Sequence, residues 1–216
     1  MNPQERLQDA RLLLVTDPRP DLAARAAAAV RGGVDIVQLR DKRAPRRELL
    51  SLASELKEIC EQAGALFTVN DDAELARLSG AAGVHLGQED GPIAIARQLL
   101  GPGAVIGRSV SSPGEALGAV REGADYLGVG TIYATPTKPE EEAAGPALLR
   151  EIARLGLPVP WFAIGGVTFE TAREVAEAGA PGFAVVRAVL DADDPGSAAR
   201  ELRSLLTEAA RDRTRT

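Results

Sequence analysis

The sequence predicts a single-domain (β/α)₈ barrel of the TIM type, an α/β fold that spans residues 1–216. Short apolar runs of strand length alternate with longer amphipathic runs, which is the pattern of a parallel sheet wrapped by helices. The alternation occurs eight times along the chain, whereas an open doubly wound sheet normally uses about five to seven strands. The length also fits, because single barrels of this kind begin at roughly 200 residues.

The predicted strands are short runs rich in leucine, valine, isoleucine and phenylalanine, which suit a sheet that is buried on both faces. In chain order they are 11–16 (RLLLVT), 34–39 (VDIVQL), 65–69 (ALFTV), 82–86 (AGVHL), 104–108 (AVIGR), 125–129 (DYLGV), 159–164 (VPWFAI) and 182–186 (GFAVV).

The amphipathic runs between the strands predict eight helices. In chain order they are 20–31, 45–63, 71–79, 92–100, 112–122, 144–155, 168–178 and 195–211. Four prolines lie where a first helical turn tolerates a missing N–H, namely Pro45, Pro92, Pro113 and Pro195. Residues 1–10 are expected to form a short N-terminal extension, and the polar tail 211–216 is expected to fray.

A glycine ends the helix before each even-numbered strand. These glycines are Gly33, Gly80, Gly123 and Gly179. Glycine supplies the left-handed C-cap that lets the chain turn back to the sheet. The spacing corresponds to two βα units each time, so the barrel is predicted to consist of four double units.

Composition narrows the functional classes. A net charge of −6 argues against a nucleic-acid surface, which needs a basic stripe, and an aromatic content of 3% argues against base stacking. No run approaches the roughly 18 apolar residues of a membrane span, and no apolar signal core opens the chain, so a cytoplasmic protein is expected. A single cysteine, Cys60, excludes an intrachain disulfide and a cysteine-built zinc site. Small molecules are the expected partners, and a homo-oligomer is left open.

In such a barrel the active site lies at the carboxyl ends of the strands, so the residues just after each strand are the candidates. The second strand ends in Gln38, Leu39, Arg40, Asp41 and Lys42. Gln38, Arg40 and Lys42 share one face of an extended segment. Two cations and an amide on one face suit a diphosphate. The alternative is a solvated turn whose charges are paired locally.

Two aspartates follow neighbouring strands. Asp71 comes after the third strand and Asp90 after the fourth, so their carboxylates are expected to converge on one cation. Hard oxygen ligands predict one Mg²⁺ ion per chain, completed by waters and substrate phosphate oxygens. The alternatives are a helix N-cap for Asp71 and a turn acid for Asp90 before Gly91-Pro92.

The connection after the sixth strand is long for a barrel loop, and it is predicted to act as a lid. Thr135, Pro136, Thr137 and Lys138 offer hydroxyl and ammonium donors in a proline-stiffened stretch. The acidic run 140–142 would repel phosphate and is expected to be solvated. A disordered surface loop is the alternative.

A phosphate site is predicted where the seventh and eighth strands end. Gly165-Gly166 and Val186-Arg187 occupy the two loops that bind phosphate in many barrels. Glycine lets backbone N–H groups approach an anion closely. A tight turn without a ligand is the alternative. The only histidine, His85, is expected to be structural or to support a neighbouring site residue.

Together these residues resemble the thiamine-phosphate synthase family. The matching segments, from the second strand to the eighth, are VQLRDK (37–42), VNDD (69–72), GVHLGQED (83–90), IGRSV (106–110), GADYLGVGTIYATPTK (123–138), AIGGV (163–167) and FAVVRAV (183–189). In this order they are highly specific. The resemblance implies an Mg²⁺-dependent transferase of thiamine biosynthesis. In that family the barrel couples hydroxymethylpyrimidine diphosphate to a thiazole phosphate and releases pyrophosphate.

The resemblance also implies a role for each matching residue. The pyrimidine diphosphate would be bound by Gln38, Leu39, Arg40, Asp41, Lys42, Asn70, Ser109 and Lys138. Of these, the residues implied in catalysis are Lys138, Arg40 and Ser109. The thiazole phosphate would be bound by Thr135, Pro136, Thr137, Gly165, Gly166, Val186 and Arg187, and Mg²⁺ by Asp71 and Asp90. The chain departs from the family pattern at Asp41, Arg108, Thr131 and Arg187.

The reaction that the resemblance implies is compatible with the residue types at the strand ends. No residue at the rim is an obvious nucleophile or strong base, and a reaction in which diphosphate leaves first needs neither. Mg²⁺ and the cations would stabilise charge on the departing diphosphate. The electron-rich aminopyrimidine would carry the positive charge until the thiazole nitrogen attacks, so a dissociative displacement is expected.

Three other functions are open at this point. The related thiazole tautomerase relies on a histidine just after the fifth strand, where this chain has SVSS (109–112). A non-catalytic phosphate-binding barrel would keep the glycine turn but would not need Asp71, Asp90 or Lys138. A phosphosugar enzyme would need a strand-end glutamate, lysine or histidine placed for enolisation, and none is.

Overall fold

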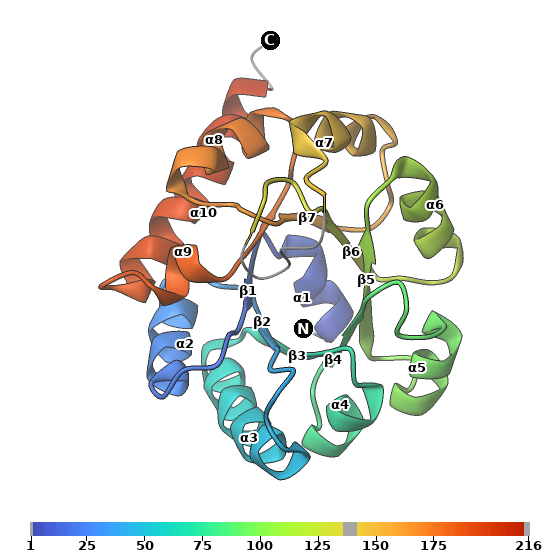
Figure 1. Ribbon diagram of the computed structural model, residues 1–216, viewed down its shortest axis with the longest axis vertical. Coiled ribbons are helices and arrows are strands. Elements are labelled where there is room, and N and C mark those ends of the chain that lie inside the picture. The colour runs from blue at the N-terminus through green and yellow to red at the C-terminus, as the bar shows by residue number, and fades with distance from the viewer. Residues whose placement is uncertain (1, 136–141, 214–216) are drawn as a thin grey trace.

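Eight parallel strands form the inner wall of the molecule. They are β1 (Leu12–Val15), β2 (Ile36–Leu39), β3 (Leu66–Asn70), β4 (Gly83–Leu86), β5 (Val105–Val110), β6 (Tyr126–Val129), β7 (Trp161–Ile164) and β8 (Phe183–Val185). The computed structural model describes residues 2–135 and 142–213. Each strand pairs with the next and β8 pairs with β1, which closes the barrel (Figure 1). The predicted (β/α)₈ fold is confirmed.

Helices surround the strands. They are α1 (Pro3–Asp9), α2 (Leu22–Arg31), α3 (Arg46–Ala63), α4 (Ala73–Ser79), α5 (Ile93–Leu100), α6 (Pro113–Arg121), α7 (Gly145–Arg154), α8 (Phe169–Glu177), α9 (Arg187–Leu190) and α10 (Pro195–Arg213). Each predicted strand and helix is present, with its ends within two residues of the expected ones. No helix in the described ranges has the length and apolar character that crossing a membrane requires.

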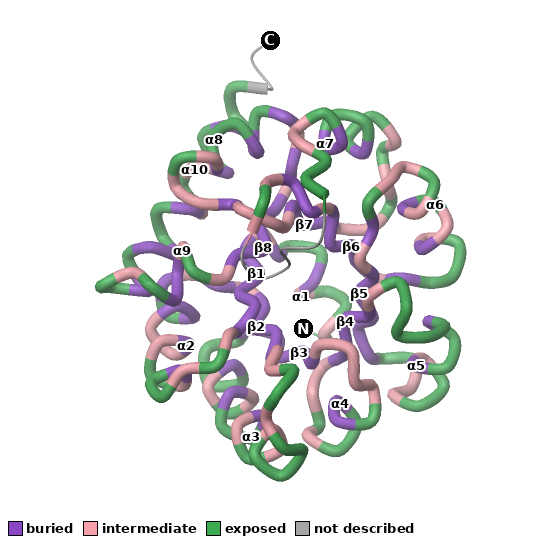
Figure 2. The backbone as a smooth tube through the Cα atoms, viewed as in Figure 1, coloured by how far each residue is buried: buried purple, intermediate pink, exposed green. Residues whose placement is uncertain are grey.

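Side chains along each strand alternate between two apolar layers, as the pleat of a strand requires. The inner layer fills the barrel and includes Ile36, Leu66 and Phe162. The outer layer lies between strands and helices and includes Val37 and Phe67, the sequence neighbours of inner residues. Figure 2 shows the strands almost entirely buried and the helices exposed on their outer faces. The barrel wall is therefore mostly apolar, and Thr68 and His85 are among its few buried polar residues.

The expected N-terminal extension, residues 1–10, includes the helix α1. The Asn2 side chain accepts the Glu5 N–H (2.8 Å) and the Glu5 carboxylate accepts the Asn2 N–H (2.9 Å), which forms a capping box at the start of α1. Leu7 is only 1% exposed and joins the inner apolar layer. In Figure 1, α1 lies across the centre of the ring of strands. It covers the amino-terminal end of the barrel, because β1 begins just after it.

The last helix also extends further than predicted. α10 continues to Arg213, two residues past its predicted end, and fraying of this tail stays a prediction. Residues 214–216 lie outside the described part of the chain.

The internal repeat is confirmed in the backbone. All four predicted cap glycines have positive φ angles of 65° to 109°: Gly33, Gly80, Gly123 and Gly179. The repeat also includes two aspartates. Asp35 accepts a backbone N–H of β1 at 2.9 Å and pairs with Arg203. Asp125 likewise accepts a backbone N–H of β5 at 2.7 Å and pairs with Arg97.

Candidate active site

Polar side chains line the inside of the barrel where the strands end. Gln38 on β2, Asn70 on β3 and Ser109 on β5 point inward, because their sequence neighbours belong to the outer apolar layer. The structure therefore brings these three predicted residues to one end of the barrel. It does not bring in the side chain of Leu39, which is 2% exposed and packs in the outer layer. Alternation along β2 is the reason.

His85 on β4 contacts Ser109. The Nε2 atom of His85 lies 2.9 Å from the Oγ atom of Ser109, and its ring packs 5.3 Å from the ring of Tyr126. A Cβ atom on Gly107 would lie 2.4 Å from His85 Nδ1 and 2.2 Å from Tyr126 Cζ, so only glycine leaves room for both rings. Burial raises the pKa of Tyr126, so its hydroxyl remains protonated. His85 thus supports a predicted substrate-binding residue, which is one of the two roles expected for it.

Two carboxylates and two cations meet where β2, β3 and β4 end. The carboxyl group of Asp71 is within hydrogen-bonding reach of Asp90, and Lys42 Nζ lies 3.6 Å from Asp71 Oδ2. Burial, followed by the hydrogen bond and charge of Asp90, raises the pKa of Asp71 to about 6. The positive charges of Lys42 and Arg40 partly offset this rise, because each lowers the pKa of the Asp71 carboxyl group. The structure therefore brings Lys42, Asp71 and Asp90 together, and Arg40 is near enough for its charge to act on Asp71.

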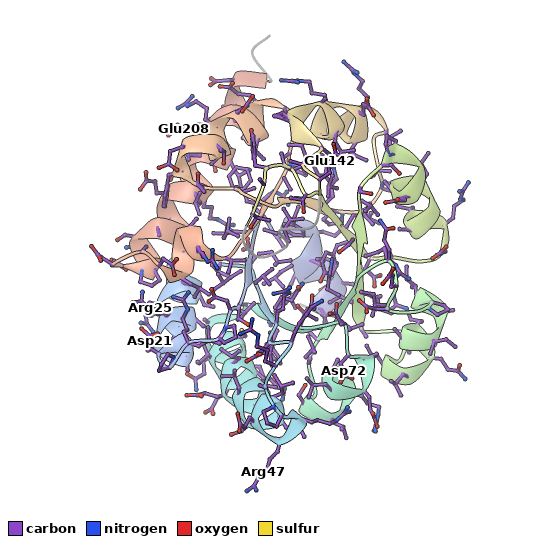
Figure 3. The ribbon with its side chains drawn as sticks, in the orientation of Figure 1. Asp21, Arg25, Arg47, Asp72, Glu142 and Glu208 are labelled. Carbon is purple, nitrogen blue, oxygen red and sulfur yellow. The ribbon has the colours of Figure 1, made fainter. Side chains whose placement is uncertain are left out.

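Asp71 has an unusual backbone. Its φ angle is 65°, in the left-handed region that few residues other than glycine, asparagine and aspartate adopt. The N-cap of α4 is not Asp71 but Asp72, which accepts the Leu75 N–H at 2.7 Å and lies at the start of α4 in Figure 3. The helix-cap alternative for Asp71 is therefore excluded, and its carboxylate is available to a ligand.

The oxygen donors at this point fit a magnesium ion. Two carboxylates that share a site repel each other when both are charged, and a divalent cation between them removes that cost. Asp90 Oδ2 also accepts the Gly87 N–H at 2.7 Å, so the turn role expected as an alternative is present as well. In the described ranges no three histidine, cysteine, aspartate or glutamate side chains gather as a metal site. Waters and substrate oxygens would have to complete the shell, as is usual for Mg²⁺.

The glycine turn after β7 packs against the β6–α7 connection. Gly165 and Gly166 have φ angles of 95° and 66°. A Cβ atom on Gly165 would come within 2.6 Å of Thr131 Cγ2, and one on Gly166 within 2.6 Å of Tyr133 Cβ. Backbone conformation and close packing therefore both require glycine here. A tight turn without a ligand is therefore enough to explain the two glycines. Phosphate binding at this turn stays a prediction.

Arg187 follows β8 and is half exposed at the rim. Its Nε atom lies 3.9 Å from Asp17 Oδ2, and Asp17 also pairs with Arg19 at 2.7 Å. Asp17 is not among the predicted site residues, which lie at the ends of strands two to eight. Its position directly after the first strand was the available signal.

Other predicted residues have a different setting. Asp41 Oδ1 accepts the N–H groups of Arg43 (2.8 Å) and Ala44 (3.1 Å), so this carboxylate closes its own turn. Thr135 is half-buried at the end of the described segment. The predicted residues Pro136, Thr137 and Lys138 lie outside the described residues.

Fold and site together define an enzyme of the (β/α)₈-barrel class, with cations and carboxylates at the carboxyl ends of its strands. A sequence model described as thiamine monophosphate synthase matches residues 12–189. The chain belongs to this family. The thiamine-phosphate synthase of Synechocystis sp. is 49% identical over 94% of this chain and 59% of that protein, so this chain spans less than two thirds of that relative. The thiamine-phosphate synthase of Mycobacterium bovis is 47% identical over 95% of this chain and 99% of that protein.

Several solved structures are similar to this chain. Thiamine phosphate pyrophosphorylase from Pyrococcus furiosus superposes with a TM-score of 0.85 at 37% identity, covering 96% of this chain and 99% of that chain. A 3-hexulose-6-phosphate synthase structure has a TM-score of 0.67 at 21% identity over 91% of this chain and 99% of that chain, which shows the shared fold alone.

Proposed function

We propose that this chain is a transferase of thiamine biosynthesis that joins hydroxymethylpyrimidine diphosphate to thiazole phosphate and releases pyrophosphate. Membership of the family and the names of the similar proteins support this reaction. The structural observation that supports it best is the grouping of Lys42, Asp71 and Asp90 at one part of the rim, with the charge of Arg40 acting on the same carboxyl group. A diphosphate needs both cationic donors and a divalent ion, and few other ligands use both at once.

The diphosphate would bind at this meeting point. Asp71 and Asp90 would hold one Mg²⁺ ion, which supplies charge stabilisation for the departing diphosphate. Arg40 offers a planar fork of donors to phosphate oxygens, and Lys42 a compact ammonium. Lys42 Nζ lies 3.6 Å from Asp71 Oδ2, so it can exchange that contact for a phosphate oxygen with little movement. The predicted Lys138 would add a third cation.

The pyrimidine ring would enter the barrel mouth between Gln38, Asn70 and Ser109. Gln38 and Asn70 provide amide donors and acceptors, and His85 orients the Ser109 hydroxyl. The carbon–oxygen bond to the diphosphate breaks first, and the electron pair leaves with the diphosphate. The thiazole nitrogen then supplies the pair for the new carbon–nitrogen bond. Neither step removes a proton from carbon, so no strong base is needed at the site.

The thiazole phosphate would lie between the glycine turn, Gly165-Gly166, and Val186-Arg187. Arg187 supports this assignment because it follows β8 and is half exposed, and among the described residues its one ion pair, with Asp17, is long at 3.9 Å. Thr135, with Pro136 and Thr137, would close over the phosphate. Both substrates carry several negative charges and would not cross a membrane unaided, which favours a cytoplasmic reaction.

The proposal is tested by incubating purified protein with both heterocyclic phosphates, with and without Mg²⁺, and by measuring thiamine phosphate and pyrophosphate. We expect equal amounts of the two products, and only when Mg²⁺ is present. Asp71→Asn and Asp90→Asn should each lower the rate on the order of 10²-fold, because the charge that holds the metal is lost. The matched control is Glu89→Gln, an exposed carboxylate beside Asp90, which should leave the rate unchanged.

A fluorinated pyrimidine diphosphate tests the order of bond breaking. Fluorine disfavours the pyrimidine cation, so the dissociative route predicts a much slower reaction. An equal rate would contradict it. Absence of thiamine phosphate under all conditions would overturn the proposed function, and conversion of the thiazole alone would instead identify a tautomerase.

A further inference from the structure

Arg108 is a buried cation directly beneath the loop that carries Asp90. It lies on β5 next to Ser109, but its side chain points outward and is paired in register with Leu86, the last residue of β4. Arg108 is only 7% exposed. A buried guanidinium is costly unless its N–H groups are satisfied. Its hydrogen-bond partners therefore indicate its role.

The two ends of the guanidinium bind the two ends of one loop. Arg108 donates to the carbonyl of Gly87 at 2.5 Å and to the carbonyl of Gly91 at 2.7 Å. These glycines flank the residues that connect β4 to α5. The φ angle of Gly91 is 90°. Glycine can leave this conformation easily, so the backbone alone does not fix the direction of the Gly91 carbonyl. The two hydrogen bonds from Arg108 hold both ends of this loop in place.

The same loop determines where the Asp90 carboxylate lies. Asp90 is exposed, so packing does not hold its side chain. Its Oδ2 atom instead accepts the Gly87 N–H at 2.7 Å, and Gly87 is the residue whose carbonyl Arg108 holds. The chain of contacts therefore runs from the β5 guanidinium, through the Gly87 peptide, to the carboxylate that faces Asp71.

We propose that Arg108 is a positioning residue for the divalent-cation site, which it maintains by holding the β4–α5 loop so that Asp90 faces Asp71. The inference rests on the proposed metal role of these two aspartates. Groups that orient a metal ligand without touching the metal typically contribute about 10- to 100-fold in metal affinity. Arginine suits the task because its planar fork reaches two carbonyls at once, which a lysine ammonium cannot do from one position.

The test measures metal binding directly, by loss of the electron paramagnetic resonance signal of free Mn²⁺ on titration with the full-length protein. Arg108→Met removes both donors while keeping an apolar stem of similar length, and Arg108→Lys retains one donor. The matched control is Arg97→Met. Arg97 also donates to backbone carbonyls, those of Ala104 and Gly123, but it pairs with Asp125 away from the site. Circular dichroism and thermal melting verify that each variant is folded.

We expect Arg108→Met to weaken Mn²⁺ binding about 10- to 100-fold, Arg108→Lys to lie between it and the unaltered protein, and Arg97→Met to bind normally. In turnover assays the Mg²⁺ concentration for half-maximal rate should rise in parallel, and high Mg²⁺ should restore the rate of Arg108→Met.

Normal Mn²⁺ binding by folded Arg108→Met would overturn the inference and leave the proposed metal site intact. If Arg108→Met does not fold, normal binding by Arg108→Lys would have the same consequence. Equal weakening in Arg97→Met would show a general loss of stability and would also overturn it. Failure of the unaltered protein to bind Mn²⁺, together with Mg²⁺-independent turnover, would instead overturn the metal site itself.

Discussion

Two features of Asp71 are unfavourable in free energy. Its backbone is left-handed, with a φ angle of 65°, and its carboxyl group is partly buried against that of Asp90. Strained and electrostatically unfavourable residues persist where the surrounding structure holds them, and they concentrate at functional sites. The pKa of Asp71 is raised from 3.8 to about 6. The fold therefore favours the protonated acid, and stability from this group is present below about pH 4 and lost as the pH rises through 6.

Asp71→Asn should therefore stabilise the metal-free protein at pH 8 while impairing metal binding. Asparagine tolerates the left-handed backbone and removes the repulsion with Asp90. The Asp71 side chain is 33% exposed, so solvent screens part of the effect. We expect a gain of about 1 kcal/mol, or a rise of roughly 2–4 °C in Tm, measured by thermal melting in a chelating buffer.

The difference in Tm between Asp71→Asn and the unaltered protein should shrink towards pH 4, where Asp71 is protonated in the folded protein and residue 71 is uncharged in both proteins. Asp72→Asn is the matched control, because asparagine caps a helix as well as aspartate does. An unchanged or lower Tm for Asp71→Asn at pH 8 would contradict the assignment of a repulsive carboxylate pair.

At the scale of elements, the largest difference between expectation and structure is α1. A helix of seven residues with one buried leucine has no readable periodicity, so its sequence resembles a polar extension. Its stability comes from the capping box at Asn2 and Glu5 and from tertiary packing. It is tied to loops at the amino-terminal end of the barrel, where Gln4 donates to the carbonyl of Pro102 at 3.0 Å.

Leu7→Ala should lower the free energy of unfolding by about 2–5 kcal/mol, because it leaves a cavity in the inner apolar layer. Urea denaturation measures this change. Gln8→Ala, an exposed position on the same helix, should change it by less than about 0.5 kcal/mol. The kcat of folded Leu7→Ala should be unaltered, since α1 and the site are at opposite ends of the barrel. Equal stability of the two variants would show that α1 does not close the core.

At the scale of the whole molecule, closure makes the fold cooperative. Every strand has a neighbour on both sides, so the barrel leaves no strand edge exposed. The last helix of the chain is joined to the others, because α10 packs against both α2 and α8. A Cβ atom on Gly32 of the α2 C-cap would lie 2.2 Å from the Gly196 carbonyl oxygen of α10, so the two backbones touch.

Cys60 reports on this cooperativity. It is 1% exposed in the outer apolar layer, and burial raises the pKa of its thiol to about 12. We expect a thiol reagent at pH 8 to label native protein only as fast as the whole molecule opens, and unfolded protein at once. The labelling rate should rise with urea with the slope of global unfolding. A rate that does not depend on urea would show that α3 opens locally.

Local sequence patterns were enough to predict the architecture and the strand ends at which polar and charged residues gather. Alternating apolar and amphipathic runs, the glycine caps and the strand ends all depend on local periodicity and backbone preference, which act within a few residues. For this reason every strand lies within two residues of its predicted position. The order of strands in a closed barrel then places Arg40, Lys42, Asp71 and Asp90 at one rim.

How those residues are held depends on long-range contacts in the folded chain. Which of Asp71 and Asp72 caps α4, which side of β2 Leu39 faces, and why β5 carries a buried arginine depend on contacts between segments far apart in the chain. The Arg108 guanidinium binds carbonyls that lie 17 and 21 residues earlier. Such contacts leave no local pattern, because the partners are backbone atoms that every residue possesses.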